Sequence, residues 1–477
     1  MPEDLTQIRD KRYPDYVYTN KPLVDIYKGT KGSSKAAKVL LGEWLKINTE
    51  DGRIPSTKRV PVLFRGGMGH VSTEDLTRQR KLEMYFIDVD QGDSILIQTP
   101  DDRRILIDGG KSNEALDFIK NKYRLDKQGH YIDFDAVVAT HSDDDHIGGL
   151  IKILRHPKIA VKRLYHNGLF RRTESAQDPG ARTASNERVF GLEDRPDVED
   201  RPELKSLMKR FLKAIDKAEE NLPIVVGKMQ EQAGRISRID LPEEGFICQR
   251  LERANGCLPP FDESNPSLTI EVLWPRAEKT GGKLSYPWFS DAGQTVNGNS
   301  IVLRVIHGKN TILLTGDLNE PSMETLLHQL SATVADPKQL TADVYKAAHH
   351  GSQHFLLEFL KVVAPNAAVI SSGDARNDIH GHPRAVLMGT ITRYSHHQTP
   401  AVFCTELAAC YTKLPKDEMK EFRASTGQLY ERALQGIVHL RSDGEQLSLA
   451  TVHGRKPIGS QLDQTTWKWD LWPTEVS

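Results

Sequence analysis

The first part of the chain alternates short apolar runs with turns. Such runs cover residues 24–27, 38–41, 43–47 and 60–64. Strands this short and this closely spaced are typical of small β-barrels. We therefore expect an all-β barrel over residues 21–78, preceded by a loose polar arm, 1–20.

The pattern changes near residue 82, where longer apolar runs begin. Residues 84–107 contain three runs and predict a β-meander, residues 113–123 predict a helix, and 134–140 predict a buried strand. Residues 148–154 then predict a second helix. A buried strand, a polar loop and a helix in this order indicate an α/β protein, in which the site lies at the carboxyl ends of the strands.

The rest of the chain adds strands and two charged interruptions. The charge-rich stretches 166–265 and 385–432 predict partly helical insertions, the first with a helix near 203–220. Residues 82–455 are therefore expected to form one α/β domain, and 456–477 a C-terminal tail. The further predicted strands lie at 269–273, 301–305, 311–314, 344–348, 368–371, 436–440 and 447–450.

Composition and charge narrow the class of protein. The 477 residues are 38% hydrophobic and 27% charged, which is ordinary for a globular protein. No apolar run approaches the roughly 18 residues that cross a bilayer, and no secretory leader is recognisable, so we expect a cytoplasmic protein without a membrane partner. The four cysteines lack CxxC spacing and predict reduced thiols. A net charge of −1 argues against a dedicated nucleic-acid binder but is compatible with a local basic groove.

One six-residue segment concentrates the candidate chemistry. Residues 141–146, His-Ser-Asp-Asp-Asp-His, follow the buried strand 134–140 directly. Negative charge this dense is costly unless a cation offsets it, and divalent metal is the usual one. A solvated acidic loop is the alternative interpretation. The apolar strand before the segment and Gly148-Gly149 after it disfavour that alternative.

Later strands end on further candidate ligands. Asp317, the pair His349-His350, and His382 each follow a predicted strand. Taken singly, each is as readily a turn or cap residue. Because strand ends meet at one edge of a sheet, these residues and the six-residue segment together predict a single metal site.

Seven motifs carry a family resemblance. They are FIDVDQGDS at 86–94, IDGG at 107–110, THSDDDHIGG at 140–149, NSIVLR at 299–304, LLTGD at 313–317, HHGS at 349–352 and GHP at 381–383. Their order resembles the metallo-β-lactamase fold superfamily, and within it the hydrolase domain of ComEC-type DNA-uptake proteins and phosphorylcholine esterases. The N-terminal segment resembles bacterial SH3-type domains through residues 24–27, 42–47 and 69–71.

The resemblance implies a four-layer αββα sandwich, with two divalent metal ions, Zn or Mn, at one edge. By position, the metal ligands would be His141 and Asp143 for one ion, Asp145, His146 and His350 for the other, and Asp317 between them. Asp108 matches an aspartate that orients the ligand loop from behind.

Two positions depart from the commonest family pattern. Most members have histidine where Asp143 stands, and the extra oxygen ligand shifts the preference from Zn²⁺ towards Mn²⁺ or Mg²⁺, while the imidazoles keep Zn²⁺ open. Many members also have a histidine ahead of the bridging aspartate. His166 is the candidate here, and a structural role is the favoured interpretation of it.

Such a centre predicts a hydrolase. Two ions would activate a hydroxide for attack on phosphorus or a carbonyl carbon. The expected catalytic side chains are Asp145, His349, His382 and Ser352. Of these, His382, helped by His349 and Ser352, would steady the developing charge or protonate the leaving group.

Phosphodiesters are the expected substrates, with nucleic acid first. The alternatives are a small-molecule phosphodiester, a carboxylic ester or lactone, and a non-catalytic binding protein on the same fold. The N-terminal barrel and the charged insertion predict docking of a protein partner or of the substrate.

Overall fold

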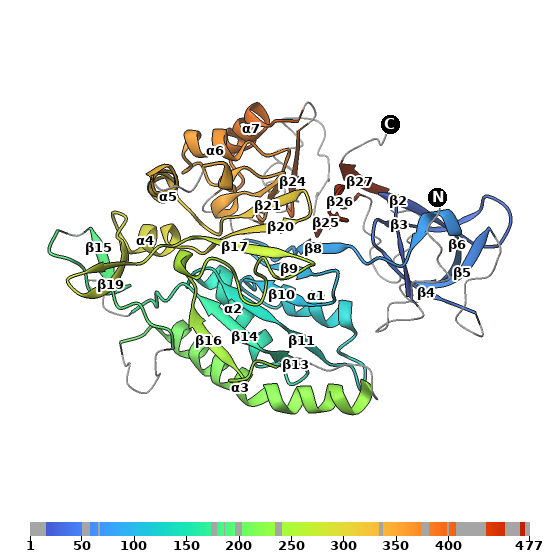
Figure 1. Cartoon of the computed structure of the whole chain (residues 1–477), viewed down its shortest axis with the longest axis horizontal. Helices are drawn as coiled ribbons and strands as arrows, with labels where there is room; N and C mark the ends of the chain where they lie inside the picture. The colour runs from blue at the N-terminus through green and yellow to red at the C-terminus, as the bar shows by residue number, and fades with distance from the viewer. Residues whose placement is uncertain are drawn as a thin grey trace, which may run out of the picture.

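The computed structural model places most of the chain. It describes residues 16–49, 58–64, 67–172, 179–185, 187–195, 203–233, 241–332, 337–373, 381–397, 400–406, 436–453 and 468–472. Figure 1 shows a small β-unit at one end and a larger α/β unit beside it.

The N-terminal unit is an antiparallel sheet with its own core. Its seven strands lie in the order β3-β2-β6-β5-β4-β1-β7. Alternate residues such as Val24 and Ile26, or Val60 and Val62, point inward and are buried, as a half-buried strand requires. The strands are β1 (Tyr16–Thr19), β2 (Leu23–Tyr27), β3 (Lys35–Leu40), β4 (Trp44–Ile47), β5 (Arg59–Phe64), β6 (Gly67–Ser72) and β7 (Leu76–Thr77).

An all-β unit was expected here, and its relation to SH3-type domains stays a prediction. One boundary differs. Strand β1 lies in the stretch predicted as a loose arm, yet it pairs with both β4 and β7. The rest of the predicted arm, 1–15, lies outside the described residues.

A nine-stranded sheet begins the larger unit. Its order is β16-β14-β12-β10-β9-β8-β25-β26-β27. The central strands are buried along their whole length because other layers cover both faces. The strands are β8 (Leu82–Phe86), β9 (Ile95–Gln98), β10 (Arg104–Ile107), β12 (Ala136–Ala139), β14 (Arg163–His166), β16 (Ile247–Arg250), β25 (Val438–Ser442), β26 (Leu447–His453) and β27 (Lys468–Trp472).

A six-stranded sheet packs against it. Its order is β17-β20-β21-β22-β23-β24, and the last four strands run parallel. Buried side chains from both sheets, including Ile97, Val138, Leu303 and Val344, form one apolar cluster between them. The strands are β17 (Thr269–Trp274), β20 (Val302–His307), β21 (Asn310–Leu314), β22 (Val344–Lys346), β23 (Ala367–Ile370) and β24 (Ala401–Cys404).

Helices cover the outer face of each sheet. Side chains of α1, α2 and α3 join the apolar cluster outside the nine-stranded sheet, and those of α5, α6 and α7 join the one outside the six-stranded sheet. The layers therefore run helix, sheet, sheet, helix (Figure 1), which confirms the α/β class. The helices are α1 (Glu114–Tyr123), α2 (Asp144–Leu154), α3 (Ser206–Ala233), α4 (Ala292–Gly298), α5 (Glu320–Ala332), α6 (Leu357–Val363) and α7 (Ala385–Tyr394).

The segments predicted as insertions contribute to these layers. Helix α3 is longer than predicted and packs on α2, while β16 extends the nine-stranded sheet. In the second segment, β24 is an edge strand of the other sheet, and residues 407–435 lie outside the described part. Strand β27 falls in the predicted tail and pairs with β26. The remaining short strands are β11 (Ile132–Phe134), β13 (Ile159–Val161), β15 (Arg188–Phe190), β18 (Glu278–Thr280) and β19 (Lys283–Pro287).

A buried charge network joins the N-terminal unit to the nine-stranded sheet. The indole N–H of Trp44 donates to Oε1 of Glu83 at 2.6 Å, and the guanidinium of Arg80 stacks 3.7 Å above the Trp44 ring. Burial alone would raise the pKa of Glu83, but Lys122, Arg441 and Arg80 outweigh burial and lower it to about 2. Trp44 is thus a junction residue between the two units.

Two expectations drawn from composition concern the cysteines and the crossing of a membrane. The described cysteines Cys248, Cys257 and Cys404 are free thiols. In the part of the chain that the structure describes, every helix is too short or too polar to cross a membrane.

Candidate metal centre

The six-residue segment lies where β12 passes into α2. His141 follows the strand, Asp143 is the N-cap of α2, and Asp145 lies in its first turn. Acidic side chains are favourable at a helix N-terminus, because the unpaired N–H groups there carry partial positive charge. The same residues therefore form the start of helix α2 and part of the candidate ligand set.

Asp317 reaches the site through a turn after β21. Gly316 has a φ of +50°, and a Cβ there would lie 2.8 Å from the Cβ of Ser300. Both the backbone conformation and the close approach require glycine. The backbone N–H of Asp317 donates to the Ser300 hydroxyl at 3.2 Å, which fixes the start of the aspartate.

The two adjacent histidines follow β22 in a strained conformation. His349 and His350 have φ of 48° and 51°, a region that costs side-chain-bearing residues roughly 1–3 kcal/mol each. As a result, the rings of these two consecutive histidines point in different directions. The His350 ring is buried at the sheet edge, and the His349 side chain is 23% exposed.

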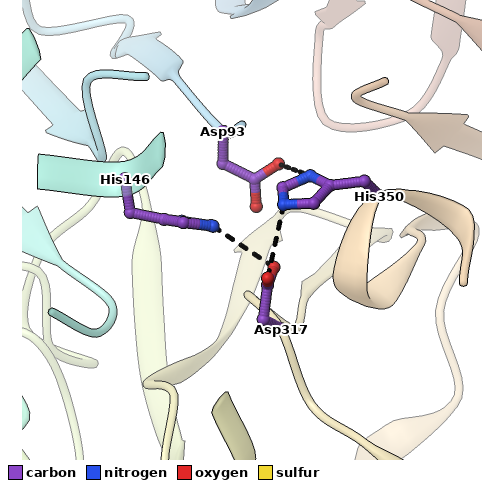
Figure 2. Close-up of side chains that lie close together, drawn as sticks. All are labelled: Asp93, His146, Asp317 and His350. Carbon is purple, nitrogen blue, oxygen red and sulfur yellow. Dashed lines mark ion pairs between the residues drawn. The ribbon is translucent and has the colours of Figure 1, made fainter. Parts of the chain in front are cut away.

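Asp317 lies at the centre of four imidazole rings. Its Oδ2 is 3.3 Å from Nε2 of His350, 3.9 Å from Nε2 of His349 and 4.0 Å from Nε2 of His141. Its Oδ1 is 3.4 Å from Nε2 of His146. Figure 2 shows the His146 and His350 rings pointing at this carboxylate from different elements. One acidic side chain thus touches ligands from both sheets.

The site attracts positive charge strongly. Burial alone would lower the pKa of His146, but the carboxylates of Asp317 and Asp108 raise it well above its usual value. The pKa of His350 is also raised well above its usual value, because Asp317 and Asp145 outweigh the opposing effect of burial. Conversely, His350 and His146 hold the pKa of Asp317 well below its usual range despite burial. The same field would stabilise a divalent cation.

Unpartnered atoms test whether such an ion fits. Nε2 of His141, of His146 and of His350, and Oδ1 of Asp317, are buried and make no hydrogen bond beyond the ion-pair contacts among the site residues themselves. Buried polar atoms are rarely left this way. Imidazole nitrogens and carboxylate oxygens are the ligands that Zn²⁺ and Mn²⁺ accept, so the residues present fit divalent metal.

Asp108 fixes the tautomer of one ligand. Its Oδ2 accepts from Nδ1 of His146 at 2.8 Å and from the Thr140 hydroxyl at 2.7 Å, and its Oδ1 accepts from the Thr140 N–H at 2.8 Å. A carboxylate only accepts, so Nδ1 of His146 carries a proton, and Nε2 is the nitrogen left to bind an ion once it is deprotonated. This carboxylate–histidine arrangement is typical of metal sites. Nδ1 of His350 similarly faces the Ser371 carbonyl at 3.1 Å.

Asp145 joins the His350 side of the centre. Its Oδ2 is 3.4 Å from Nε2 of His350. Burial opposes ionisation of Asp145, but His350 and His146 outweigh it and lower its pKa. The second predicted ligand group, Asp145, His146 and His350 with Asp317, is thus brought together.

The first predicted ligand group is looser. Oδ2 of Asp143 is 3.9 Å from Nε2 of His141, while its Oδ1 accepts from Nε of Arg171 at 2.6 Å. The candidate third ligand, His166, points elsewhere. Its Nε2 contacts the Asp194 carbonyl at 2.6 Å and its Nδ1 accepts from the Gly168 N–H at 3.0 Å, which leaves neither nitrogen for an ion.

Two predicted catalytic residues lie behind the centre. The His382 ring is buried, with its centroid 5.6 Å from that of His349 and 6.4 Å from that of His350. The Ser352 hydroxyl accepts from the backbone N–H of His354 at 3.2 Å. Among the described contacts, neither residue reaches Asp317. The N–H of Ser352 donates to the carbonyl of His349 at 2.8 Å, and the His382 ring lies against the rings of both histidines.

Sequence reasoning missed two buried residues. Asp93 places a carboxylate 3.6 Å from Nδ1 of His350 and forms an ion pair with Lys346. One carboxylate oxygen of Asp93 lies within 4.8 Å of ligand atoms of His146, Asp317 and His350. A signal existed, because a lysine inside an apolar run such as 344–348 requires a buried partner.

A cleft of about 330 Å³ opens beside the centre. Carboxylates dominate its lining near the helix start, and Lys111 lies 3.9 Å from Asp144 at its edge. The lining residues are Gln91, Lys111, Asp143, Asp144, Asp145, Asn297, Asp317 and His349. His349 and Asp145 are therefore the predicted catalytic residues that face this space.

Comparison with known proteins gives three findings. Residues 87–218 match the family model of the metallo-beta-lactamase superfamily. The chain is 25% identical over 327 residues to ComE operon protein 3 of Bacillus subtilis (strain 168), covering 66% of this chain and 31% of that protein. It thus spans about a third of that relative's length. A solved structure of Zn(2+)-bound PqqB from Methylobacterium extorquens matches with 13% identity and a TM-score of 0.24, over 55% of this chain and 60% of that one.

Proposed function

We propose that this metallo-beta-lactamase superfamily domain is a metal-dependent hydrolase of phosphodiesters, with nucleic acid as the leading substrate. The observation that carries the proposal is the set of unpartnered ligand atoms around Asp317, next to an open cleft. Buried ligands beside an open cleft are the arrangement of a catalytic metal site rather than a closed structural one. When bound, the ions would supply Lewis acidity and lower the pKa of a water.

Carboxylates dominate the lining of the cleft, so binding of an anionic substrate would depend on the metal ions, with His349 and Lys111 as further donors. Burial lowers the pKa of His349, although Asp317 opposes it, so its ring is largely neutral near pH 7. A neutral imidazole can donate a hydrogen bond to a phosphoryl oxygen or hold a proton for the leaving group. Lys111 adds a positive charge at the rim. Asp145 would bind the metal and orient the water.

Oxygen ligands support phosphorus over carbon as the point of attack. Asp143, Asp145 and Asp317 stand beside three imidazoles, and harder, oxygen-rich sites suit the Mn²⁺ and Mg²⁺ of phosphoryl chemistry. We therefore expect Mn²⁺ or Zn²⁺ as the working ion, up to two per chain. The preference for nucleic acid rests on the motif resemblance to ComEC-type hydrolase domains.

A small phosphodiester is the second candidate, and the size of the cleft favours it. A volume of about 330 Å³ lies at the lower end of small-ligand sites. Nucleic acid would enter with one nucleotide in the cleft and few phosphate contacts, because net charge is only −1. Its binding should therefore show a shallow salt dependence. The N-terminal unit and α3 are the proposed docking surfaces for a protein partner.

The test uses a substrate panel. Full-length protein stripped by chelator is given Mn²⁺ or Zn²⁺ and incubated with bis-p-nitrophenyl phosphate, single- and double-stranded DNA, RNA, and a lactone. We expect cleavage of the diester and at least one nucleic acid. Cleavage of the small diester alone would favour the second candidate. Cleavage of the lactone alone, or of nothing, would refute a phosphodiesterase.

A further inference from the structure

The two halves of the centre are built unequally. On one side, His146, His350 and Asp145 all approach Asp317 or one another within 3.4 Å. On the other side, the corresponding distances of His141 to Asp143 and to Asp317 are 3.9 and 4.0 Å. Among the described residues, the compact group of possible ligands at this centre is Asp93, His146, Asp317 and His350; it leaves out Asp145 as well as His141 and Asp143. The looser half is called the first position below.

Among the residues that the structure describes, an arginine rather than a third ligand stands at the first position. Arg171 lies five residues beyond His166, and its backbone carbonyl accepts from the Lys205 N–H at 3.1 Å, just before α3. This contact ties the arginine to the nine-stranded side of the fold. Its Nε donates to Asp143 at 2.6 Å, and the two side chains are only 18% and 24% exposed. The pair is therefore poorly screened by water.

A guanidinium is permanently charged, so it can shield a carboxylate but cannot bind a metal. Asp143 can offer Oδ2 to an ion while Arg171 holds Oδ1. The ion then lies within a few ångströms of a fixed positive charge and shares the carboxylate's negative charge with it. Like charges at this separation repel appreciably in a partly buried setting. Occupation of the first position is therefore opposed by Arg171.

We propose that Arg171 competes with metal for Asp143 and makes the first position a weak site, so that the centre holds one ion tightly and takes a second only at higher concentration. The proposal rests on the proposed metal-dependent function. It differs from an orienting role, in which Arg171 would hold Asp143 in place and strengthen binding. The two roles predict opposite effects when the guanidinium is removed.

The experiment titrates Mn²⁺ into chelator-stripped full-length protein by calorimetry. We expect two steps in the wild type, the second at least ~10-fold weaker, the scale on which groups behind metal ligands act. Arg171→Gln should narrow this gap at least ~10-fold and leave the tight step unchanged. Arg172→Gln is the matched control, because it removes the same charge from the next residue, whose guanidinium pairs with Glu193 at 3.7 Å.

Several results of the titration would overturn the proposal. An unchanged or wider gap in Arg171→Gln, or a narrowed gap in Arg172→Gln, overturns the proposal. If Arg171→Gln does not fold, a measurement on the wild-type protein still tests the proposal. Electron paramagnetic resonance should show spin-coupled Mn²⁺ pairs only at excess metal, and equal filling of both positions overturns the inference. No binding of metal to any variant would instead refute the proposed function.

Discussion

Asp108→Asn tests whether the carboxylate behind His146 sets the metal affinity. Asp108 has a φ of 57°, and asparagine tolerates this left-handed conformation as well as aspartate does. The substitution therefore changes charge and hydrogen bonding with little change of backbone or volume. Alanine would remove volume as well and confuse the result.

The expected magnitude follows from three hydrogen bonds. Asp108 accepts one from His146 and two from Thr140, and an amide keeps only one accepting atom. If the amide nitrogen faces the Thr140 N–H, a buried donor loses its partner at about 1–3 kcal/mol. If it faces Nδ1 of His146, the ring must carry its proton on Nε2, where the ion would bind. Metal affinity should then fall ~10- to 100-fold, or about 1.4–2.8 kcal/mol.

The assay is a chelator competition for Zn²⁺ or Mn²⁺, with urea unfolding alongside. Asp343→Asn is the matched control. Asp343 accepts from the N–H and hydroxyl of Thr311 at 2.8 and 3.2 Å but touches no histidine in the described contacts. Both variants should lose stability, and only Asp108→Asn should lose metal affinity. A folded Asp108→Asn protein within twofold of the wild-type affinity would refute the reasoning.

The remaining predictions concern the centre and the junction. Asp317→Ala should lower turnover at least ~10³-fold while keeping the far-ultraviolet circular dichroism spectrum, because it removes a principal electrostatic contributor; near-normal turnover would place the chemistry elsewhere. His166→Gln should unfold at lower urea but bind as much metal by elemental analysis as the wild type, and loss of metal would restore it as a ligand. The pKa of Glu83 is depressed to about 2 from 4.5, so its stabilisation is present above pH 4.5 and is lost as pH falls towards 2. Glu83 should account for roughly 3 kcal/mol of the unfolding free energy that the wild type loses across that window. Glu83→Gln should lose less by about that amount, while other buried carboxylates still titrate; parallel curves of unfolding free energy against pH would contradict the prediction.

Local patterns in the sequence sufficed for the elements and for most candidate ligands. The run 134–140 predicted a buried strand because strands covered on both faces are continuously apolar, and β12 lies there. The segment 141–146 predicted a ligand loop because its residues are neighbours in the chain. Asp317 and His350 were predicted because parallel strand ends converge at one edge, and the structure brings both within 3.3 Å.

Boundaries could not be predicted where pairing depends on distant partners. Residues 16–19 and 468–472 are polar or mixed and resemble loose ends, yet β1 and β27 pair with β4 and β26. A strand of this kind gains its hydrogen bonds from another segment, and its own sequence carries little trace of that. The sequence likewise predicts α3 as part of an insertion, whereas in the structure this helix packs on α2.

The sequence by itself determined the α/β class, the chemistry of the ligands and the order in which they occur. Only the tertiary structure decided which side chains stand behind and between them. Lys346 meets Asp93 across 253 residues of chain, and Arg171 rather than His166 reaches Asp143. The physical reason is the distance along the chain over which each feature is set. Ligand type and strand pattern depend on neighbouring residues, whereas the packing of whole layers decides which charged side chains come into contact. The unequal spacing of the ligand atoms in the two halves of the centre is therefore a property of the fold.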